Sequence, residues 1–249
     1  MAGFWKFFLL VLMMVFERRM YKEARKTWNP FVGCLHDCSY CKPSFQVQVK
    51  RVGVVFGCKD CIAYKPHFHP ERLENLEKRL PKTRGDEFIF CCDTGDWTFA
   101  KPEWRKRILE AVERLKDRTF LIQSKNPACF QENTFPENVI LGITLETNRD
   151  ELCQAISKAP PPSKRYKDFS AVNHPRKIVT VEPIMDFDLE TLADWITEIN
   201  PLCTYIGYNS RSKPKLPEPP LIKTISLIET LEKRGIPVRR KLIRKAWNE

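Results

Sequence analysis

The chain has 249 residues, enough for one large domain or two small ones, and its 43% hydrophobic content excludes a disordered chain. Its formal net charge of +11 favours polyanionic partners such as nucleic acid, without proving one. Ten cysteines at this length exclude a small disulfide-stapled domain, and their clustering indicates metal or redox chemistry.

The first 20 residues form an apolar segment that differs from the rest of the chain. Its uninterrupted apolar run, residues 7–16, is too short to span a bilayer comfortably, and no small-residue cleavage site follows it. The segment fits a membrane-surface helix, a helix packed on the domain, or a start-site artefact with translation beginning at Met13, Met14 or Met20. We favour the artefact. We therefore expect a main domain over residues 21–249, no stable membrane association and a cytoplasmic location, because an oxidising compartment would oxidise clustered thiols.

The stretch TWNPFVGCLHDCSYC, residues 27–41, places Cys34, Cys38 and Cys41 in a C-x3-C-x2-C array. A disulfide with one leftover thiol is disfavoured in a reducing compartment. A structural zinc site has four ligands and favours C-x2-C pairs, so it does not need the wider spacing before Cys38. Three soft thiolates suit a four-iron cluster whose fourth iron keeps an open position for catalysis.

A second pair, Cys58 and Cys61, forms a lone C-x2-C. With His67 and His69 it could make a zinc site, and with the three-cysteine array it could complete a four-thiolate zinc site. One such pair is weak evidence for a metal, so free thiols or an auxiliary role remain the favoured alternative.

Short apolar runs alternate with amphipathic helical stretches over the rest of the chain. Helices are predicted over residues 69–80, 101–117, 149–157, 189–199 and 221–235, and strands over 87–92, 119–125, 138–146, 177–183, 204–210 and 236–243. The proline-rich stretches 159–164 and 213–220 are predicted to be loops. Repeated strand–helix units predict parallel strands with helical crossovers, hence an α/β fold that is either a barrel or a doubly wound sheet.

Five cysteines are expected to be core residues: Cys91, Cys92, Cys129, Cys153 and Cys203. Cys91 and Cys92 are neighbours in a predicted strand, so we expect their side chains to face opposite sides of the sheet.

Polar residues follow the predicted strands, at positions 93–96, 124–126, 146–148, 182–183 and 209–210. In barrels the functional residues lie at the C-terminal ends of the strands, and a doubly wound sheet binds its ligands at the same edge. The pattern therefore locates a site at this edge without choosing between the two architectures.

The three-cysteine array, with an aromatic residue before its last cysteine, resembles the defining motif of radical S-adenosylmethionine (SAM) enzymes. Further stretches in the same order, among them KPHFHPERL, FCCDTGDWTF, IQSKNP and VTVEPI, resemble a radical SAM subgroup of unassigned function found in phage and prokaryotic genomes. That subgroup is distantly similar to spore photoproduct lyase-like proteins. The resemblance covers roughly residues 26–210 and implies a partial (β/α)6 TIM-like barrel.

The resemblance implies a 4Fe-4S cluster on Cys34, Cys38 and Cys41, with S-adenosyl-L-methionine on the open iron. Reductive cleavage of SAM would give a 5′-deoxyadenosyl radical that acts on an unknown substrate. An electron donor similar to flavodoxin or ferredoxin would supply the electron. Nucleic acid is the first expected substrate, from the net charge and the distant resemblance to photoproduct lyases.

Two alternatives remain open at this point. One is a zinc-binding, non-catalytic nucleic-acid-binding module that uses the three-cysteine array together with Cys58 and Cys61. The other is a cluster protein that transfers electrons without cleaving SAM.

The resemblance also implies contacts with SAM at the strand ends. Thr94, Gly95 and Asp96 stand where the superfamily's Gly-Gly-Glu motif holds the amino group of the cofactor, and Thr94 and Asp96 depart from that motif. The Asp96 carboxylate could still accept hydrogen bonds from an ammonium group. The other positions expected to lie at the cofactor are Tyr40, Ser124, Lys125, Glu146 and Glu182.

The densest run of basic residues lies near the C-terminus, at Arg234, Arg239, Arg240, Lys241, Arg244 and Lys245. A solvated surface is the favoured interpretation. A phosphate-binding patch, with Trp247 as a stacking platform, is the alternative.

Overall fold

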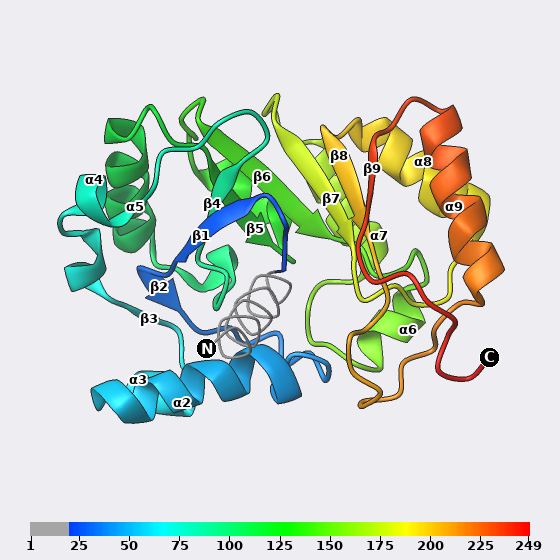
Figure 1. Cartoon of the computed structure of the whole chain (residues 1–249), viewed down its shortest axis with the longest axis horizontal. Helices are drawn as coiled ribbons and strands as arrows, with labels where there is room; N and C mark the ends of the chain where they lie inside the picture. The colour runs from blue at the N-terminus through cyan, green and yellow to red at the C-terminus, as the bar shows by residue number, and fades with distance from the viewer. Residues whose placement is uncertain (1–19) are drawn as a thin grey trace, which may run out of the picture.

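The computed structural model describes residues 20–249, which form a curved, seven-stranded parallel sheet (Figure 1). Its strands are β1 (Ala24–Trp28), β4 (Phe88–Cys91), β5 (Phe120–Ser124), β6 (Val139–Thr144), β7 (Lys177–Val181), β8 (Cys203–Ile206) and β9 (Val238–Arg240). They lie side by side in chain order, and each neighbouring pair is parallel. In a doubly wound sheet the strand order reverses at a switch point, whereas here the strands follow one another without a reversal. The order therefore confirms the predicted α/β partial barrel.

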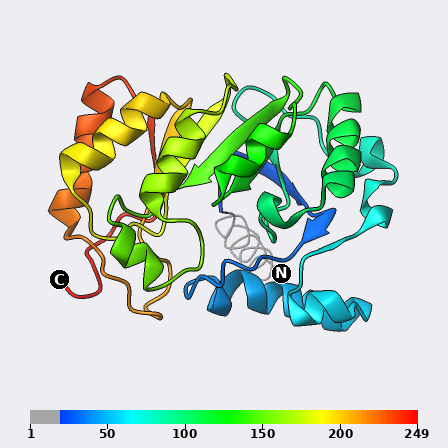
Figure 2. The same cartoon turned by 180° about the vertical axis from the view of Figure 1, so that it is seen from behind.

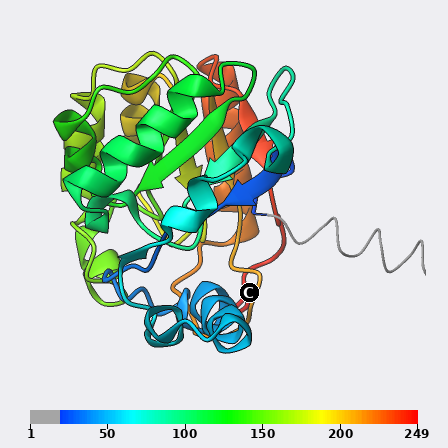
Figure 3. The same ribbon diagram turned by 90° about the vertical axis from the view of Figure 1, so that its left-hand side faces the viewer.

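Helices cover the convex side of the sheet (Figure 2). They are α4 (Leu76–Arg79), α5 (Pro102–Arg114), α7 (Pro162–Ser170), α8 (Leu189–Ile199) and α9 (Leu221–Lys233). The short α6 (Asp150–Gln154) lies beyond the C-terminal ends of the strands (Figure 1). Helix α5 is representative: Ile108, Ala111 and Val112 are fully buried on one face, at the spacing of an amphipathic helix. A second unit of structure, the helices α2 (Val47–Phe56) and α3 (Lys59–Ala63), packs as a pair away from the barrel (Figure 3).

Side chains alternate along the strands between two apolar cores, as the period of a strand requires. One core lies under the helices and includes Ile89, Ile122, Leu141 and Val179. The other lines the concave side and includes Phe88, Phe90, Leu121, Ile140, Ile178 and Tyr205 around the buried ring of Tyr21. The Tyr21 hydroxyl bonds Gln123 (2.7 Å) and Thr180 (2.9 Å), so the concave side becomes polar further along β5 and β7.

Most predicted helices and strands are confirmed, and the strands end earlier than predicted because the chain turns before the polar residues at their tips. Two segments differ. The predicted helix over 69–80 is broken into a 3₁₀ turn, Pro70–Leu73, and the short α4, because Asn75 adopts a left-handed conformation (φ 52°) between them. The predicted loop 159–164 contains the start of α7, which has proline at its first position.

The predicted burial of these five cysteines is confirmed, but the predicted orientation of the Cys91 and Cys92 side chains is not. Cys129, Cys153 and Cys203 are buried, as are Cys91 and Cys92. The expectation that Cys91 and Cys92 face opposite sides is wrong: their sulfur atoms lie 3.5 Å apart. Strand β4 ends at Cys91, and Cys92 takes a positive φ (62°), which turns its side chain back towards its neighbour.

The C-terminal basic residues are mostly ion-paired. Arg234 pairs with Glu190 and Asp194, and Arg244 with Glu218. The others with partners are Arg239, paired with Glu23 and Asp86, Arg240, paired with Glu232, and Lys241, paired with Glu182. These partners offset much of the positive charge of the run, and the pairs of Arg239 and Arg240 lie on β9 itself.

The apolar N-terminal segment, residues 1–20, lies outside the described residues, apart from Met20. Within residues 20–249, the structure contains no helix with the length and apolar character needed to cross a membrane.

Candidate active site

The three-cysteine loop begins where β1 and the two-residue strand β2 (Phe31–Val32) reach the C-terminal edge of the sheet. The β1 residue Trp28 pairs with Cys91 at the end of β4. Further on, the Gly33 amide donates to the Thr94 carbonyl (3.2 Å), and the Asp96 amide donates to the Gly33 carbonyl (3.3 Å). These bonds place Cys34 beside the polar residues that follow β4.

Gly33 lies where two segments touch. Strand β2 pairs with β3 (His67–Phe68), and the chain before β3 crosses over Gly33. A Cβ atom on Gly33 would lie 2.4 Å from the carbonyl carbon of Lys65, and its φ of 103° disfavours any L side chain. Only glycine lets the loop start this close to the neighbouring segment.

Replacing Gly33 with alanine is expected to lower the free energy of unfolding by about 2–6 kcal/mol, from backbone strain and the clash with Lys65 together. Urea unfolding measures this as a lower midpoint at an unchanged m value. Gly57 is the matched control, because its φ is also positive (66°) but nothing lies within 4 Å of its added Cβ. Gly57→Ala should lose only about 1–2 kcal/mol. Equal losses at the two glycines would contradict the close approach at Gly33.

The cysteine side chains lie close together within the loop. Cys38 is buried, and Cys34 and Cys41 are half-buried. A hydrogen bond with Cys41 and the positive charge of Lys125 lower the pKa of the Cys38 thiol to about 5, against the effect of burial. Burial raises the pKa of Cys34, and the hydrogen bond with Cys38 raises that of Cys41. The loop thus brings three soft sulfur ligands together, and the positive charge of Lys125 stabilises the thiolate form of Cys38.

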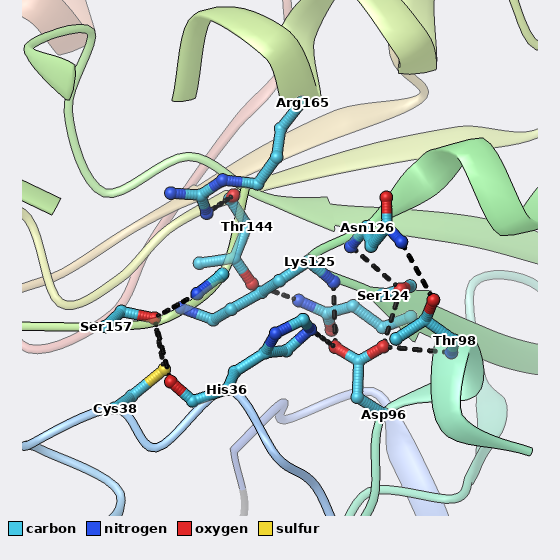
Figure 4. A network of polar contacts seen from close by, with 12 residues as sticks. His36, Cys38, Asp96, Thr98, Ser124, Lys125, Asn126, Thr144, Ser157 and Arg165 are labelled. Atoms are coloured by element: carbon cyan, nitrogen blue, oxygen red, sulfur yellow. Dashed lines mark hydrogen bonds and ion pairs between the residues drawn. The ribbon is translucent and has the colours of Figure 1, made fainter. Parts of the chain in front are cut away.

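Residues 156–158 hold the far side of the loop. The Ser39 amide donates to the Ile156 carbonyl (2.9 Å), and the Lys158 amide donates to the His36 carbonyl (2.7 Å). The hydroxyl of Ser157 lies 3.0 Å from the Cys38 sulfur (Figure 4). Segments from both halves of the barrel therefore fix the position of the cysteines.

Glu146 follows β6 and is completely buried. Arg165 of α7 donates to its Oε2 at 2.7 Å, and Lys125 and Tyr40 bond its Oε1. Burial alone would raise the pKa of this carboxyl, but the charges of Arg165 and Lys125 hold it below its usual range. Likewise, burial favours the neutral form of Lys125, while Cys38 and Glu146 hold its pKa above the usual value. The result is a charged cluster that connects the cysteine loop with the tips of β5 and β6.

Asp96 lies at the centre of a second network (Figure 4). Its Oδ1 accepts from the Ser124 hydroxyl (2.6 Å) and the Thr98 amide (3.1 Å). Its Oδ2 accepts from the Lys125 amide (2.8 Å) and lies 3.2 Å from Nε2 of His36. Groups of the chain thus surround both oxygens, which favours a role in positioning the loop through His36. A contact between Asp96 and the SAM ammonium stays a prediction.

Most of the predicted site residues come together, and the structure adds others. Tyr40, Lys125 and Glu146 form one group, and Asp96 and Ser124 form another, with Thr94 and Gly95 bonded to the start of the loop. Glu182 follows β7 and bonds Lys241 instead, and burial raises its pKa. The residues that the sequence did not assign to this site are His36, Ser157, Arg165 and Lys241. Lys241 was noted only as part of the C-terminal basic run. Only His36 had a local signal, its position inside the cysteine array.

The similarity of this chain to known proteins lies in its fold. No family model and no curated protein matches the sequence. Among solved structures, a radical SAM methyltransferase from Sphaerobacter thermophilus superposes with a TM-score of 0.52 at 12% identity, over 90% of this chain and 68% of that one. This chain has the fold of radical SAM enzymes. SuiB from Streptococcus suis also superposes, with a TM-score of 0.50 at 13% identity, and a second structure of SuiB has S-adenosylmethionine bound.

The radical SAM fold of this chain corresponds to part of those enzymes. The chain spans about two thirds of the methyltransferase and about half of SuiB. At these identities the likeness concerns the barrel, and it confirms the partial TIM-like fold expected from the three-cysteine motif.

Proposed function

We propose that this protein is a radical SAM enzyme. The observation that carries the proposal is the placement of Cys34, Cys38 and Cys41 in one loop at the C-terminal edge of a radical SAM barrel. Three thiolates without a fourth fit a 4Fe-4S cluster that keeps one iron open for SAM. When bound, the cluster and SAM supply reductive cleavage of a carbon–sulfur bond and abstraction of hydrogen from a substrate.

The residues around the loop have matching tasks in this proposal. The ammonium group of Lys125 offsets negative charge at the sulfur ligands, and a change in charge beside a cluster shifts its reduction potential. Glu146 keeps Lys125 and the Tyr40 hydroxyl in place. Asp96 and His36 fix the first half of the loop. We expect SAM to contact residues of this group, together with Thr94, Gly95, Ser124 and Glu182.

Metal analysis and cofactor turnover test the proposal. The full chain is purified without air, reconstituted with iron and sulfide, and assayed for both. Dithionite and SAM are then added, with 5′-deoxyadenosine as the readout. About four irons per chain and formation of 5′-deoxyadenosine would support the proposal. Iron without SAM cleavage would favour an electron-transfer protein, and neither iron nor cleavage would reject both.

A zinc-binding nucleic-acid module is the second candidate, but the structure changes which cysteines could bind its zinc. The cysteines do not make one site: Cys58 and Cys61 group with His67 and His69, whereas Cys34 groups with His36 and Asp96. A module of this kind therefore would not use the three-cysteine loop. Zinc alone in the metal analysis would favour it over the enzyme.

The partners also remain proposals. We propose nucleic acid as the substrate class, supported by the net charge of +11. The ion pairs of the C-terminal basic residues weaken the case for a phosphate-binding patch there. Binding that falls steeply with salt would support a nucleic-acid substrate. We further propose a flavodoxin- or ferredoxin-like electron donor and a reducing, cytoplasmic compartment, which agrees with ten unpaired cysteines.

A further inference from the structure

Four potential metal ligands meet between α3 and β3, apart from the three-cysteine loop. They are Cys58, Cys61, His67 and His69, and one ligand atom from each lies within 4.8 Å of all the others. Nε2 of His67 is 3.5 Å from the Cys58 sulfur and 3.2 Å from the Cys61 sulfur. Nε2 of His69 is 3.4 Å from the Cys61 sulfur. With zinc bonds of about 2.0–2.3 Å, the edges of a tetrahedron are about 3.3–3.8 Å long, so these three nitrogen–sulfur spacings are close to those that a zinc ion needs. The 2.8 Å between the two Nε2 atoms is shorter and would lengthen around the ion.

The hydrogen bonds of the two imidazoles point to a cation between them. Nδ1 of His67 lies 2.7 Å from the Lys65 carbonyl, which can only accept, so this nitrogen carries a proton. Nδ1 of His69 lies 2.8 Å from the Glu71 carboxylate and is protonated for the same reason. In neutral imidazoles both Nε2 atoms then present lone pairs, yet they face each other at 2.8 Å. Two lone pairs at this distance repel, so the pair needs either a proton on one Nε2 atom or a metal cation that accepts both lone pairs. The two cysteine sulfurs within 3.5 Å of these nitrogens favour the metal cation.

The partners of Nδ1 are also those that metal-bound histidines use. A carbonyl or a carboxylate on the second ring nitrogen fixes the tautomer and orients the ring towards the metal. Here one histidine has each kind of partner, Lys65 and Glu71. The sulfur ligands are arranged by the chain too, because the Cys58 sulfur accepts from the Cys61 amide at 3.4 Å at the start of α3.

We propose that Cys58, Cys61, His67 and His69 bind a structural Zn²⁺ ion. The four protein ligands complete a tetrahedron and leave no open position, which distinguishes this site from a catalytic one. It is independent of the 4Fe-4S cluster.

The proposed zinc would support the three-cysteine loop. Strand β3 pairs with β2 through Val32 and His67 only two residues before Cys34. Strands β2 and β3 contribute two residues each, so their pairing alone is marginal. Val32 also packs with Val49 of α2 and with Cys61. A metal bond between α3 and β3 would therefore lock both helices of the α2–α3 pair against the start of the cysteine loop.

X-ray absorption at the zinc edge tests the proposal on the full chain with its cluster reconstituted and one equivalent of zinc added. We expect one zinc per chain with two sulfur and two nitrogen neighbours. Zinc bound by three sulfurs, or zinc that a mild chelator removes completely, would overturn the proposal. Iron is counted in the same sample, so failure of the zinc site and failure of the cluster are separate results.

Variants identify the ligands. His67→Ala should lose the zinc, and His174→Ala is the matched control, because His174 bonds the Val139 carbonyl far from this group. His67→Cys should keep one zinc and gain a third sulfur neighbour, which shows a direct ligand even if the alanine variant folds poorly. Retention of zinc in His67→Ala, or an unchanged sulfur count in His67→Cys, would overturn the assignment.

Discussion

Replacing Cys38 with alanine is expected to abolish cluster binding, so that the reconstituted chain keeps almost none of its iron and forms no detectable 5′-deoxyadenosine. Cys38 is the most deeply buried thiol of the loop, and Lys125 stabilises its negative charge. Two remaining thiolates cannot hold a cluster that needs at least three ligands. Iron and sulfide assays after anaerobic reconstitution measure the first loss, and chromatography of the SAM products measures the second.

Cys203→Ala is the matched control for this loss. Cys203 is also a buried thiol, but it lies in β8 and packs on the concave core with Ile178 and Tyr205. The control should keep its iron and its cleavage of SAM. If Cys38→Ala retains iron as well as Cys203→Ala does, the cysteine loop does not hold the cluster and the proposed function fails.

The sequence predicts a strand of the sheet wherever a short run of apolar residues is followed directly by polar residues. Strands β6 and β7 are buried throughout and β5 is buried apart from Gln123, as parallel strands between two cores should be. The edge strand β1 was missed, because three of its five residues are exposed and its sequence, ARKTW, has no apolar run. Its place in the sheet depends on pairing with β4, which no local pattern encodes.

The strand tips were predictable because side chains alternate. Lys125 continues the concave series of Leu121 and Gln123, and Glu146 continues that of Ile140 and Thr144. In these two cases the alternation continues past the last residue of the strand and directs the polar side chain into the barrel. Their partners were not predictable in the same way. Arg165 lies on a helix far along the chain, and arginine is rarely buried, so nothing in its surroundings marks it as an internal residue.

Replacing Arg165 with methionine is expected to lower the free energy of unfolding by about 3–5 kcal/mol. Both side chains of the Arg165–Glu146 ion pair are completely buried, and the guanidinium also donates to the Thr144 carbonyl at 2.6 Å. Methionine fills much of the same space but leaves the Glu146 carboxylate with Lys125, Tyr40 and the weak thiol donor of Cys153. Denaturant unfolding of the full chain measures the loss, which is a large share of the stability of an ordinary domain.

A neighbour on the same helix is the control. Lys164 pairs with Asp168 at the surface, four residues apart, and Lys164→Met should cost only about 0.3–0.5 kcal/mol. Adding Glu146→Gln to Arg165→Met should recover part of the loss, because no buried charge is then left without its main partner.

The sign of the pH dependence follows from the lowered pKa of Glu146. The ion pair stabilises the fold above the pKa of an unfolded glutamate, about 4.3, and this contribution is lost as the pH falls below that value. The difference between the native chain and Arg165→Met should therefore stay constant from about pH 7 to about pH 5 and shrink as the pH falls below about 4.3. A difference that stays constant below that value as well would mean that Arg165 stabilises the barrel through packing rather than through its charge.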